Sequence, residues 1–145
     1  MIGFDTNLLI RYIEEDEPTQ LNLVAKLVNL LNEEQRGFIS LVALAETVWF
    51  LGKREGATRE SQVAGIQRLL GLEHVTLQSQ DDVIEALELF ESTNAEFSDC
   101  LIERCGQSSG CNRTMTFDRK ASRVETFRLL TGASVEVLRM ESHAS

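Results

Sequence analysis

Short apolar runs alternate along the chain with longer segments in which apolar residues recur every three or four positions. The short runs are typical of buried β-strands, and they cover residues 1–4, 37–40, 74–77, 112–117 and 134–138. The longer segments predict amphipathic helices, and they cover residues 8–13, 18–31, 41–53, 58–70, 81–94, 97–106 and the segment after Asp118. Strands separated by helices indicate a mostly parallel sheet covered on both faces. We therefore expect an α/β fold with a central sheet of four or five strands.

Hydroxyl side chains stand at the predicted starts of several helices. Ser40, Thr58 and Ser98 are each placed to accept a hydrogen bond from a backbone N–H of the first helical turn. The helix after Ser40 extends to about Lys53 and is almost entirely apolar, so we expect it to be buried on most sides. Glu46 lies in the middle of this apolar helix and cannot act as its cap. Its carboxylate needs another explanation.

The length of 145 residues fits one domain of ordinary size. Hydrophobic residues make up 43% and charged residues 26%, which is typical of a globular protein. We expect one domain over residues 1–140 and a loose C-terminal tail over 141–145. No apolar run approaches the roughly 18 residues of a membrane span, and no basic segment leads into an apolar core at the start. We expect a cytoplasmic protein in which Cys100, Cys105 and Cys111, whose spacing matches no zinc site, are reduced thiols.

The net charge of −9 argues against a protein that binds nucleic acid with its whole surface. The charges are unevenly distributed along the chain. Residues 73–103 contain nine acids and no lysine or arginine, whereas residues 113–139 contain six basic residues and three acids. A polyanion would therefore approach the C-terminal part of the chain.

Four acidic residues can meet at one edge of the predicted sheet. Asp5 and Asp118 follow predicted strands directly, Asp99 stands in the first turn of a predicted helix, and Glu46 lies in the helix after the second strand. In an open parallel sheet the ligand crevice lies beyond the carboxyl ends of the strands. Each aspartate taken alone is more simply explained as a helix cap, but that explanation does not apply to Glu46.

Clustered carboxylates repel one another unless a cation neutralises them. Magnesium or manganese fits such a cluster, because these hard cations prefer oxygen ligands. Arg119, Lys120 and Arg123 follow Asp118 and could contact phosphate oxygens brought to the metal, although a solvated helix face explains them equally well. A carboxylate-bound metal beside cations is suited to hydrolysis of phosphodiester bonds.

Four segments together resemble the successive motifs of PIN-domain ribonucleases, and the chain is most similar to the VapC-type toxins of bacterial toxin-antitoxin pairs. The segments are Phe4-Asp5-Thr6-Asn7, Ser40 through Ala45-Glu46, Phe97-Ser98-Asp99-Cys100-Leu101-Ile102 and Thr116-Phe117-Asp118-Arg119. They follow in the family's order over nearly the whole chain. The resemblance implies a PIN-like three-layer sandwich and a metal-dependent endoribonuclease that is the toxin of a type II toxin-antitoxin system.

The resemblance also implies roles for individual residues. The metal ligands, binding Mg²⁺ or Mn²⁺ and activating water for RNA cleavage, would be Asp5, Glu46, Asp99 and Asp118. The residues that line or orient the site would be Thr6, Asn7, Ser40 and Thr116, with Glu96 as a further candidate where many relatives carry an aspartate. Ser98 and Cys100 replace alanines of many relatives. The expected partners are RNA, a second copy of the chain, and a cognate antitoxin whose C-terminal segment covers the active site.

Two other interpretations are open. A non-catalytic binding module would keep the PIN fold and the antitoxin interface without turnover. An aspartate-nucleophile phosphatase would use Asp5 at its strand-to-loop position, but Asn7 replaces the second acid expected in that scheme and Glu46 has no role in it.

Overall fold

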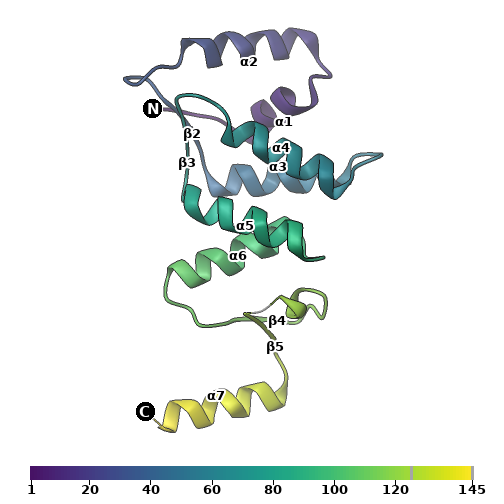
Figure 1. Cartoon of the computed structure of the whole chain (residues 1–145), viewed down its shortest axis with the longest axis vertical. Coiled ribbons are helices and arrows are strands. Elements are labelled where there is room, and N and C mark those ends of the chain that lie inside the picture. Colours follow the sequence, from purple (N-terminus) through teal and green to yellow (C-terminus); the bar gives the residue numbers. More distant parts are fainter. Residues whose placement is uncertain (125, 145) are drawn as a thin grey trace.

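The computed structural model describes residues 1–124 and 126–144. It contains two small parallel sheets with helices around them (Figure 1). The elements in chain order are β1 (Ile2–Gly3), α1 (Thr6–Glu14), α2 (Pro18–Leu30), β2 (Gly37–Ile39), α3 (Leu41–Lys53), α4 (Arg59–Leu70), β3 (Val75–Leu77), α5 (Gln80–Ser92), α6 (Phe97–Ser108), β4 (Thr114–Thr116), the 3₁₀ turn η1 (Ala121–Arg123), β5 (Phe127–Leu129) and α7 (Gly132–Ala144). No helix of the described residues has the length and apolar character needed to cross a membrane.

The first sheet has the strand order β1-β2-β3, and the second consists of β4 and β5. All three pairings are parallel, with Ile2 opposite Gly37, Gly37 opposite Val75, and Thr114 opposite Phe127. The α/β class and the parallel strands are thus confirmed, but the strands form two sheets where one central sheet was expected. The reason lies in β1, whose two residues leave few backbone groups for a ladder on its second edge. The N–H groups of Ile2 and Phe4 donate to the Arg36 and Phe38 carbonyl groups on the β2 side, which leaves only Gly3 of this segment directed to the other edge.

Capping side chains fix the starts of the central helices. Ser40 Oγ accepts a hydrogen bond from Ala43 N at 3.1 Å, so α3 begins and ends where the sequence predicts. Thr58 and Ser61 form a reciprocal capping box at the start of α4. Ser98, in contrast, is not a cap, because α6 begins at Phe97 and its N-cap residue is Glu96.

The hydrophobic core joins the first sheet to the helices around it. Fully buried side chains come from most of these elements and include Leu9, Ile39, Leu44, Ile66, Phe90 and Phe97. The rings of Phe90 and Phe97 meet edge to face, with centroids 5.9 Å apart and planes at 82°. This pair links α5 to the start of α6. The core thereby positions the helix that carries Asp99.

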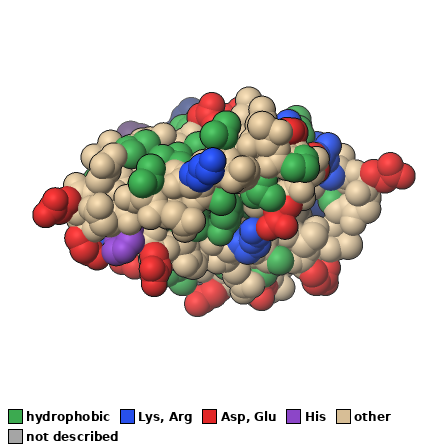
Figure 2. Space-filling view, turned by 90° about the horizontal axis from the view of Figure 1, so that it is seen from above, with side chains coloured by type: hydrophobic (Ala, Val, Ile, Leu, Met, Phe, Trp, Pro, Cys, Tyr) green, Lys and Arg blue, Asp and Glu red, His purple; other side chains and the backbone are tan. Residues whose placement is uncertain are grey.

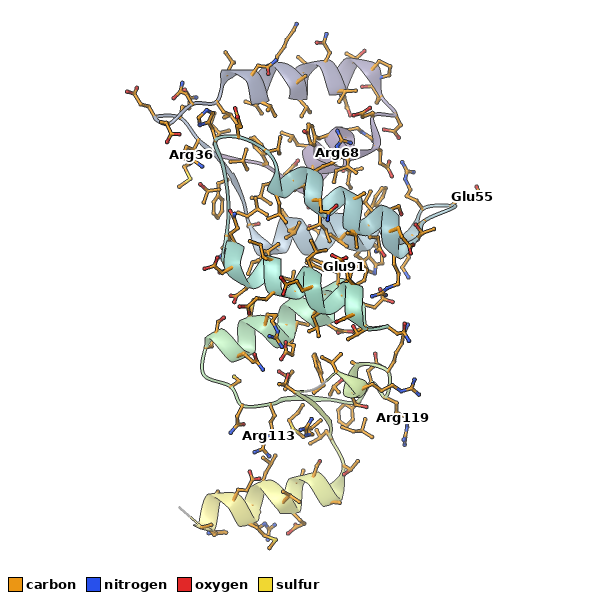
Figure 3. All side chains as sticks on the ribbon, in the orientation of Figure 1. Arg36, Glu55, Arg68, Glu91, Arg113 and Arg119 are labelled. Atoms are coloured by element: carbon orange, nitrogen blue, oxygen red, sulfur yellow. The ribbon has the colours of Figure 1, made fainter. Side chains whose placement is uncertain are left out.

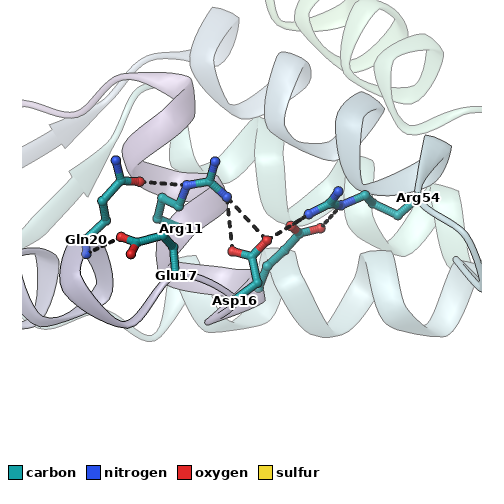
Figure 4. A network of polar contacts seen from close by, with 6 residues as sticks. Arg11, Asp16, Glu17, Gln20 and Arg54 are labelled. Carbon is teal, nitrogen blue, oxygen red and sulfur yellow. Dashed lines mark hydrogen bonds and ion pairs between the residues drawn. The ribbon is translucent and has the colours of Figure 1, made fainter.

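A polar network ties the end of α1 to the end of α3 (Figure 4). Arg11 donates to Gln20 Oε1 at 2.8 Å and to Asp16 Oδ1 at 3.0 Å. Arg54, at the C-cap of α3, pairs with Glu14 and lies 3.1 Å from Asp16 Oδ2. The network therefore holds the turn between α1 and α2 against the end of α3.

The C-terminal part differs from the sequence prediction. Residues 134–138, predicted as a strand, belong to α7, and the last strand is β5. The helix predicted after Asp118 is only the single turn η1. Thr131 explains the first difference, because its N–H donates to Ser134 Oγ at 2.8 Å while Ser134 N donates to Thr131 Oγ1 at 3.1 Å, which starts a helix. The segment from 141, expected as a loose tail, is helical as far as Ala144.

Exposed apolar side chains gather on two helices. Leu23 and Leu30 of α2 are exposed, and the view from the α2 end shows hydrophobic side chains in the middle of that face with acidic ones around its rim (Figure 2). Helix α7 lies at the opposite end of the molecule, and none of its residues 132–144 is buried (Figure 1). Arg113, at 2.9 Å from Glu141, connects it to the segment before β4 (Figure 3).

A substitution at Gly37 tests how tightly side chains pack around the first sheet. A Cβ atom at this position would lie 2.8 Å from the Phe4 ring, 3.2 Å from Val75 and 3.3 Å from Leu31. We expect Gly37→Ala to lower the free energy of unfolding in urea by about 1–3 kcal/mol, because a buried strand cannot move away from the added methyl group. Gly3→Ala in the adjacent strand is the matched control, since no atom lies within 4 Å there. Equal stability of the two variants would contradict this account of the packing.

Candidate active site

Asp5 lies directly after β1 and caps α1. Its Oδ1 atom accepts a hydrogen bond from Leu8 N at 3.0 Å, and the residue is exposed. Asp5 is therefore the N-cap of α1, as the simpler interpretation of this aspartate predicts. Capping also fixes the direction of the side chain at the start of the helix.

Glu46 lies close to Asp5 through a contact between α1 and α3. The Thr6 hydroxyl donates to Glu46 Oε1 at 2.9 Å. Glu46 is exposed, because the buried face of α3 consists of Ala43, Leu44, Thr47, Val48 and Leu51. Glu46 therefore reaches the surface, next to the start of α1 and on the side of the helix that also exposes Val42 and Trp49.

Asp99 lies in the first turn of α6 within a second acidic group. Partial burial raises the pKa of the Asp99 carboxyl above its ordinary value of 3.8, and the negative charges of Asp118 and Glu96 raise it further. Lys120 lowers this pKa. These couplings show that Asp118, Glu96 and Lys120 all lie near Asp99, although they come from different parts of the chain.

The turn after β4 holds Asp118 in place. Thr116 Oγ1 accepts a hydrogen bond from Asp118 N at 3.0 Å, and Asp118 Oδ1 accepts one from Lys120 N at 2.8 Å. The hydroxyl of Thr116 thus supports the turn that carries the acid. Arg119 projects outward from the same turn (Figure 3), and the three cations Arg119, Lys120 and Arg123 are exposed.

The predicted acids therefore form two neighbouring groups. Asp5 and Glu46 lie around Thr6, whereas Asp99, Asp118 and Glu96 lie around the start of α6. Helices α3 and α6 pack against each other, and a small cleft between them is lined on one side by Trp49 and on the other by Glu96 and Ser98. The two groups thus lie on elements that contact each other, but the charges that shift the pKa of Asp99 are those of Asp118, Glu96 and Lys120 and include neither Asp5 nor Glu46.

The side chains of these acids are of the type that binds a divalent metal, but they are not arranged to hold one. Carboxylate oxygens are the ligands that Mg²⁺ and Mn²⁺ prefer, and the mutual repulsion at Asp99 is the kind that a cation relieves. Within residues 1–124 and 126–144, however, no three Asp, Glu, His or Cys side chains are close enough to hold a metal ion. The division of the strands into two sheets separates Asp118 from Asp5, because β4 is not paired with β1.

Two other predicted site residues lie near these groups. Ser40 is engaged as the N-cap of α3. Asn7 is exposed and lines a shallow, mainly apolar groove between α1 and α2 with Leu8, Arg11 and Leu23. Neither has a described contact with one of the four acids.

Sequence reasoning missed Glu103, which is completely buried in α6. Its carboxylate accepts hydrogen bonds from Arg104, one of them at 2.8 Å, and from the Thr126 hydroxyl just before β5. It therefore fastens the β4–β5 unit to α6. The available signal was its spacing, since Glu103 follows Asp99 by four residues and lies on the same side of the helix.

Arg59 is a second residue that the sequence did not single out. Its guanidinium lies 3.9 Å from the centroid of the Phe90 ring and donates to the Phe90 and Ala95 carbonyl groups, to Ala95 at 3.1 Å. It holds the loop that leads to Glu96. Nothing in the sequence distinguishes it from an ordinary arginine in the first turn of a helix.

Comparison with known proteins agrees with this geometry. The profile of the PIN domain family matches residues 2–126, and the chain therefore belongs to the PIN domain family. PIN domains are commonly metal-dependent nucleases and act on nucleic acids. No curated protein matches the chain.

The raised pKa of Asp99 predicts how stability depends on pH. The folded protein binds the proton of the Asp99 carboxyl more tightly than the unfolded chain does. This proton stabilises the fold fully below pH 3.8, and the stabilisation is lost as the pH rises through the raised pKa. Because the Asp99→Asn variant cannot ionise at this position, we expect wild type to lose stability relative to the variant over this window. Urea unfolding at a series of pH values measures the difference.

The same measurement in an Asp118→Asn background is the control. Removing the neighbouring charge removes one cause of the raised pKa, so the pH-dependent gain from Asp99→Asn should shrink. An identical gain in both backgrounds would show that the two carboxylates do not interact.

Proposed function

We propose that this PIN domain protein is a metal-dependent endoribonuclease that hydrolyses RNA phosphodiester bonds. The observation that supports the proposal is the presence of two acidic groups on helices that pack against each other, one held by the contact between Thr6 and Glu46 and the other centred on Asp99. A sequence with a net charge of −9 gains nothing in stability from placing further like charges together. Such a cost is typical of functional sites.

In this proposal Asp5, Glu46, Asp99 and Asp118 hold Mg²⁺ or Mn²⁺. The cation supplies a lowered pKa for bound water and neutralises charge on the phosphate. The protein contributes the orientation of its carboxylates. Thr6 orients Glu46 by its hydrogen bond, and Thr116 supports the turn that carries Asp118, with Asn7, Ser40 and Glu96 as further residues around the site.

The exposed cations after Asp118 are proposed to contact the RNA backbone. Arg119, Lys120 and Arg123 lie in the turn that follows β4 and in η1, beside the second acidic group. Phosphate contacts of this kind position a nucleic acid without reading its sequence. They would place a phosphodiester group next to Asp99 and Asp118.

We further propose that the chain is the toxin of a type II toxin-antitoxin pair that acts in the cytoplasm, consists of one PIN domain and forms a homodimer. An antitoxin segment that covers the acidic groups would block access of RNA. The exposed apolar residues of α2 and α7 support the presence of protein partners, because isolated monomers rarely leave such groups uncovered. Helix α7 has apolar side chains, such as Val137 and Met140, and none of its residues 132–144 is buried.

A second candidate function is a PIN-fold binding module without turnover. It is favoured by one observation, that no three metal-binding side chains lie together among the residues that the structure describes. The two candidates differ in RNA cleavage. Cleavage that requires Mg²⁺ or Mn²⁺ and stops on addition of EDTA supports the nuclease.

The Asp5→Asn variant tests the catalytic role of Asp5 while keeping a helix cap at this position. Asparagine caps a helix as well as aspartate does, so we expect the free energy of unfolding to change by less than about 0.5 kcal/mol, whereas RNA cleavage should be abolished. Asp5→Ala is the companion variant, and it should lose both the activity and about 1 kcal/mol of stability. Full cleavage by Asp5→Asn with metal present would refute the assignment of Asp5.

Metal binding can be measured without activity. If both acidic groups hold one cation, Mn²⁺ should raise the stability of the wild-type protein, by about 2.7 kcal/mol when its free concentration is 100 times Kd. Glu46→Gln and Asp99→Asn each remove a carboxylate from a different group, and each should abolish most of this increase in a thermal unfolding assay. An increase that survives in both variants would place the metal elsewhere.

A further inference from the structure

Two large aromatic side chains lie exposed near the second acidic group. Trp49 of α3 is 62% exposed and Phe117, directly after β4, is 79% exposed. Trp49 lines the cleft whose other wall contains Glu96 and Ser98. Phe117 precedes Asp118, which lies near Asp99. Both rings therefore border the second acidic group, Trp49 through the cleft and Phe117 through its neighbour Asp118.

We propose that Trp49 and Phe117 are the base-contacting residues of this protein, each stacking on an unpaired nucleobase of the RNA. The proposal rests on the proposed ribonuclease function and names the residues that hold its substrate. Bases of single strands stack on exposed aromatic side chains, whereas paired bases within a duplex do not present their faces.

The charge of the protein makes base contacts important. With a net charge of −9 and acidic groups at the centre of the site, the phosphate backbone gains little from the surface as a whole. Neutral rings attract nucleobases without requiring positive charge. Each ring also has cations beside it, because Lys53 Nζ lies 5.5 Å from the centroid of the Trp49 ring and Arg119 and Lys120 follow Phe117 in the chain.

A protein partner fits these two rings less well. The cores of protein interfaces are depleted of charged residues, but the exposed side of α3 around Trp49 carries Glu46 and Lys53 besides Val42, and Phe117 precedes Asp118 and Arg119. Helix α7, with Val135, Val137 and Met140 exposed and none of residues 132–144 buried, offers a larger apolar surface for a protein partner. The position of the rings, next to the second acidic group, suits a single strand that passes over it.

The test uses the fluorescence of Trp49, which is the only tryptophan in the chain. A single-stranded oligouridylate is titrated into the full-length protein in EDTA, so that no cleavage occurs. We expect saturable quenching of the fluorescence, and at least about fivefold weaker binding when the same strand is annealed to oligoadenylate. Since Lys53, Arg119 and Lys120 flank the rings and Arg123 follows in η1, affinity should fall with salt with a log-log slope no steeper than about −3.

Variants measured by anisotropy of a labelled oligouridylate assign the contact to the rings. Phe117→Leu and Trp49→Leu should each weaken binding by about 5- to 150-fold, which is the range measured for loss of one stacked base. Phe117→Tyr keeps an aromatic ring and should bind within about twofold of wild type. Leu30→Ala, at another exposed apolar position on α2, is the matched control and should leave binding unchanged.

Three outcomes overturn the proposal: absence of quenching, equal affinity for single strand and duplex, and unchanged affinity in both leucine variants. Loss of self-association in these variants at unchanged RNA affinity would assign the rings to a protein interface and also overturn it. Metal-dependent cleavage by the wild type is measured in parallel. If the wild type cleaves RNA and the ring variants bind it as the wild type does, the nuclease proposal stands and the base-contact proposal fails. If binding depends on the rings but the wild type does not cleave RNA, the base contacts are supported and the nuclease proposal is refuted.

Discussion

The packing of α3 against α1 and α6 is the constraint on which both acidic groups depend. The buried side of α3, which includes Leu44 and Val48, faces the core, so Glu46 has to lie on the exposed side. There the Thr6 hydroxyl reaches it from the first residue of α1. The contact of the same helix with α6 brings the Asp99 group alongside. One amphipathic helix therefore carries Glu46 and packs against the helix that carries Asp99.

Locating the acids side by side has an electrostatic cost that the rest of the structure offsets. Asp99 is partly buried next to Asp118 and Glu96, and its pKa is raised by that burial and by those charges. The edge-to-face contact of Phe90 with Phe97 holds the start of α6 in spite of this repulsion. Arg59 reinforces the same region through its hydrogen bond to the Ala95 carbonyl group.

Local sequence signals predicted much of the fold. Apolar spacing and the hydroxyl of Ser40 were sufficient to predict α3 with its observed bounds, because both act within one turn of helix. The strand predicted around Ser134 was wrong, because the side chains alternate as in a strand but the reciprocal hydrogen bonds between Ser134 and Thr131 start a helix. The buried contact of Glu103 with Thr126 joins residues 23 positions apart, and no local pattern announces it.

The arrangement of the predicted site residues was only partly predictable from the sequence. The sequence indicated four acids, three at strand ends or helix starts and Glu46 within a helix, and the structure places them in two groups. What the sequence could not show is that β1, with only two residues, does not pair with β4 and so leaves Asp118 on a separate sheet. That separation depends on long-range backbone pairing, which side-chain patterns do not report.

The central claim is that the two acidic groups act as one metal site. The most direct measurement is anomalous X-ray diffraction from crystals of the full-length protein grown with Mn²⁺. We predict a manganese peak bounded by carboxylate oxygens from both groups, with Glu46 on one side and Asp99 on the other. A protein that cleaves RNA but shows no manganese between these residues would contradict the account.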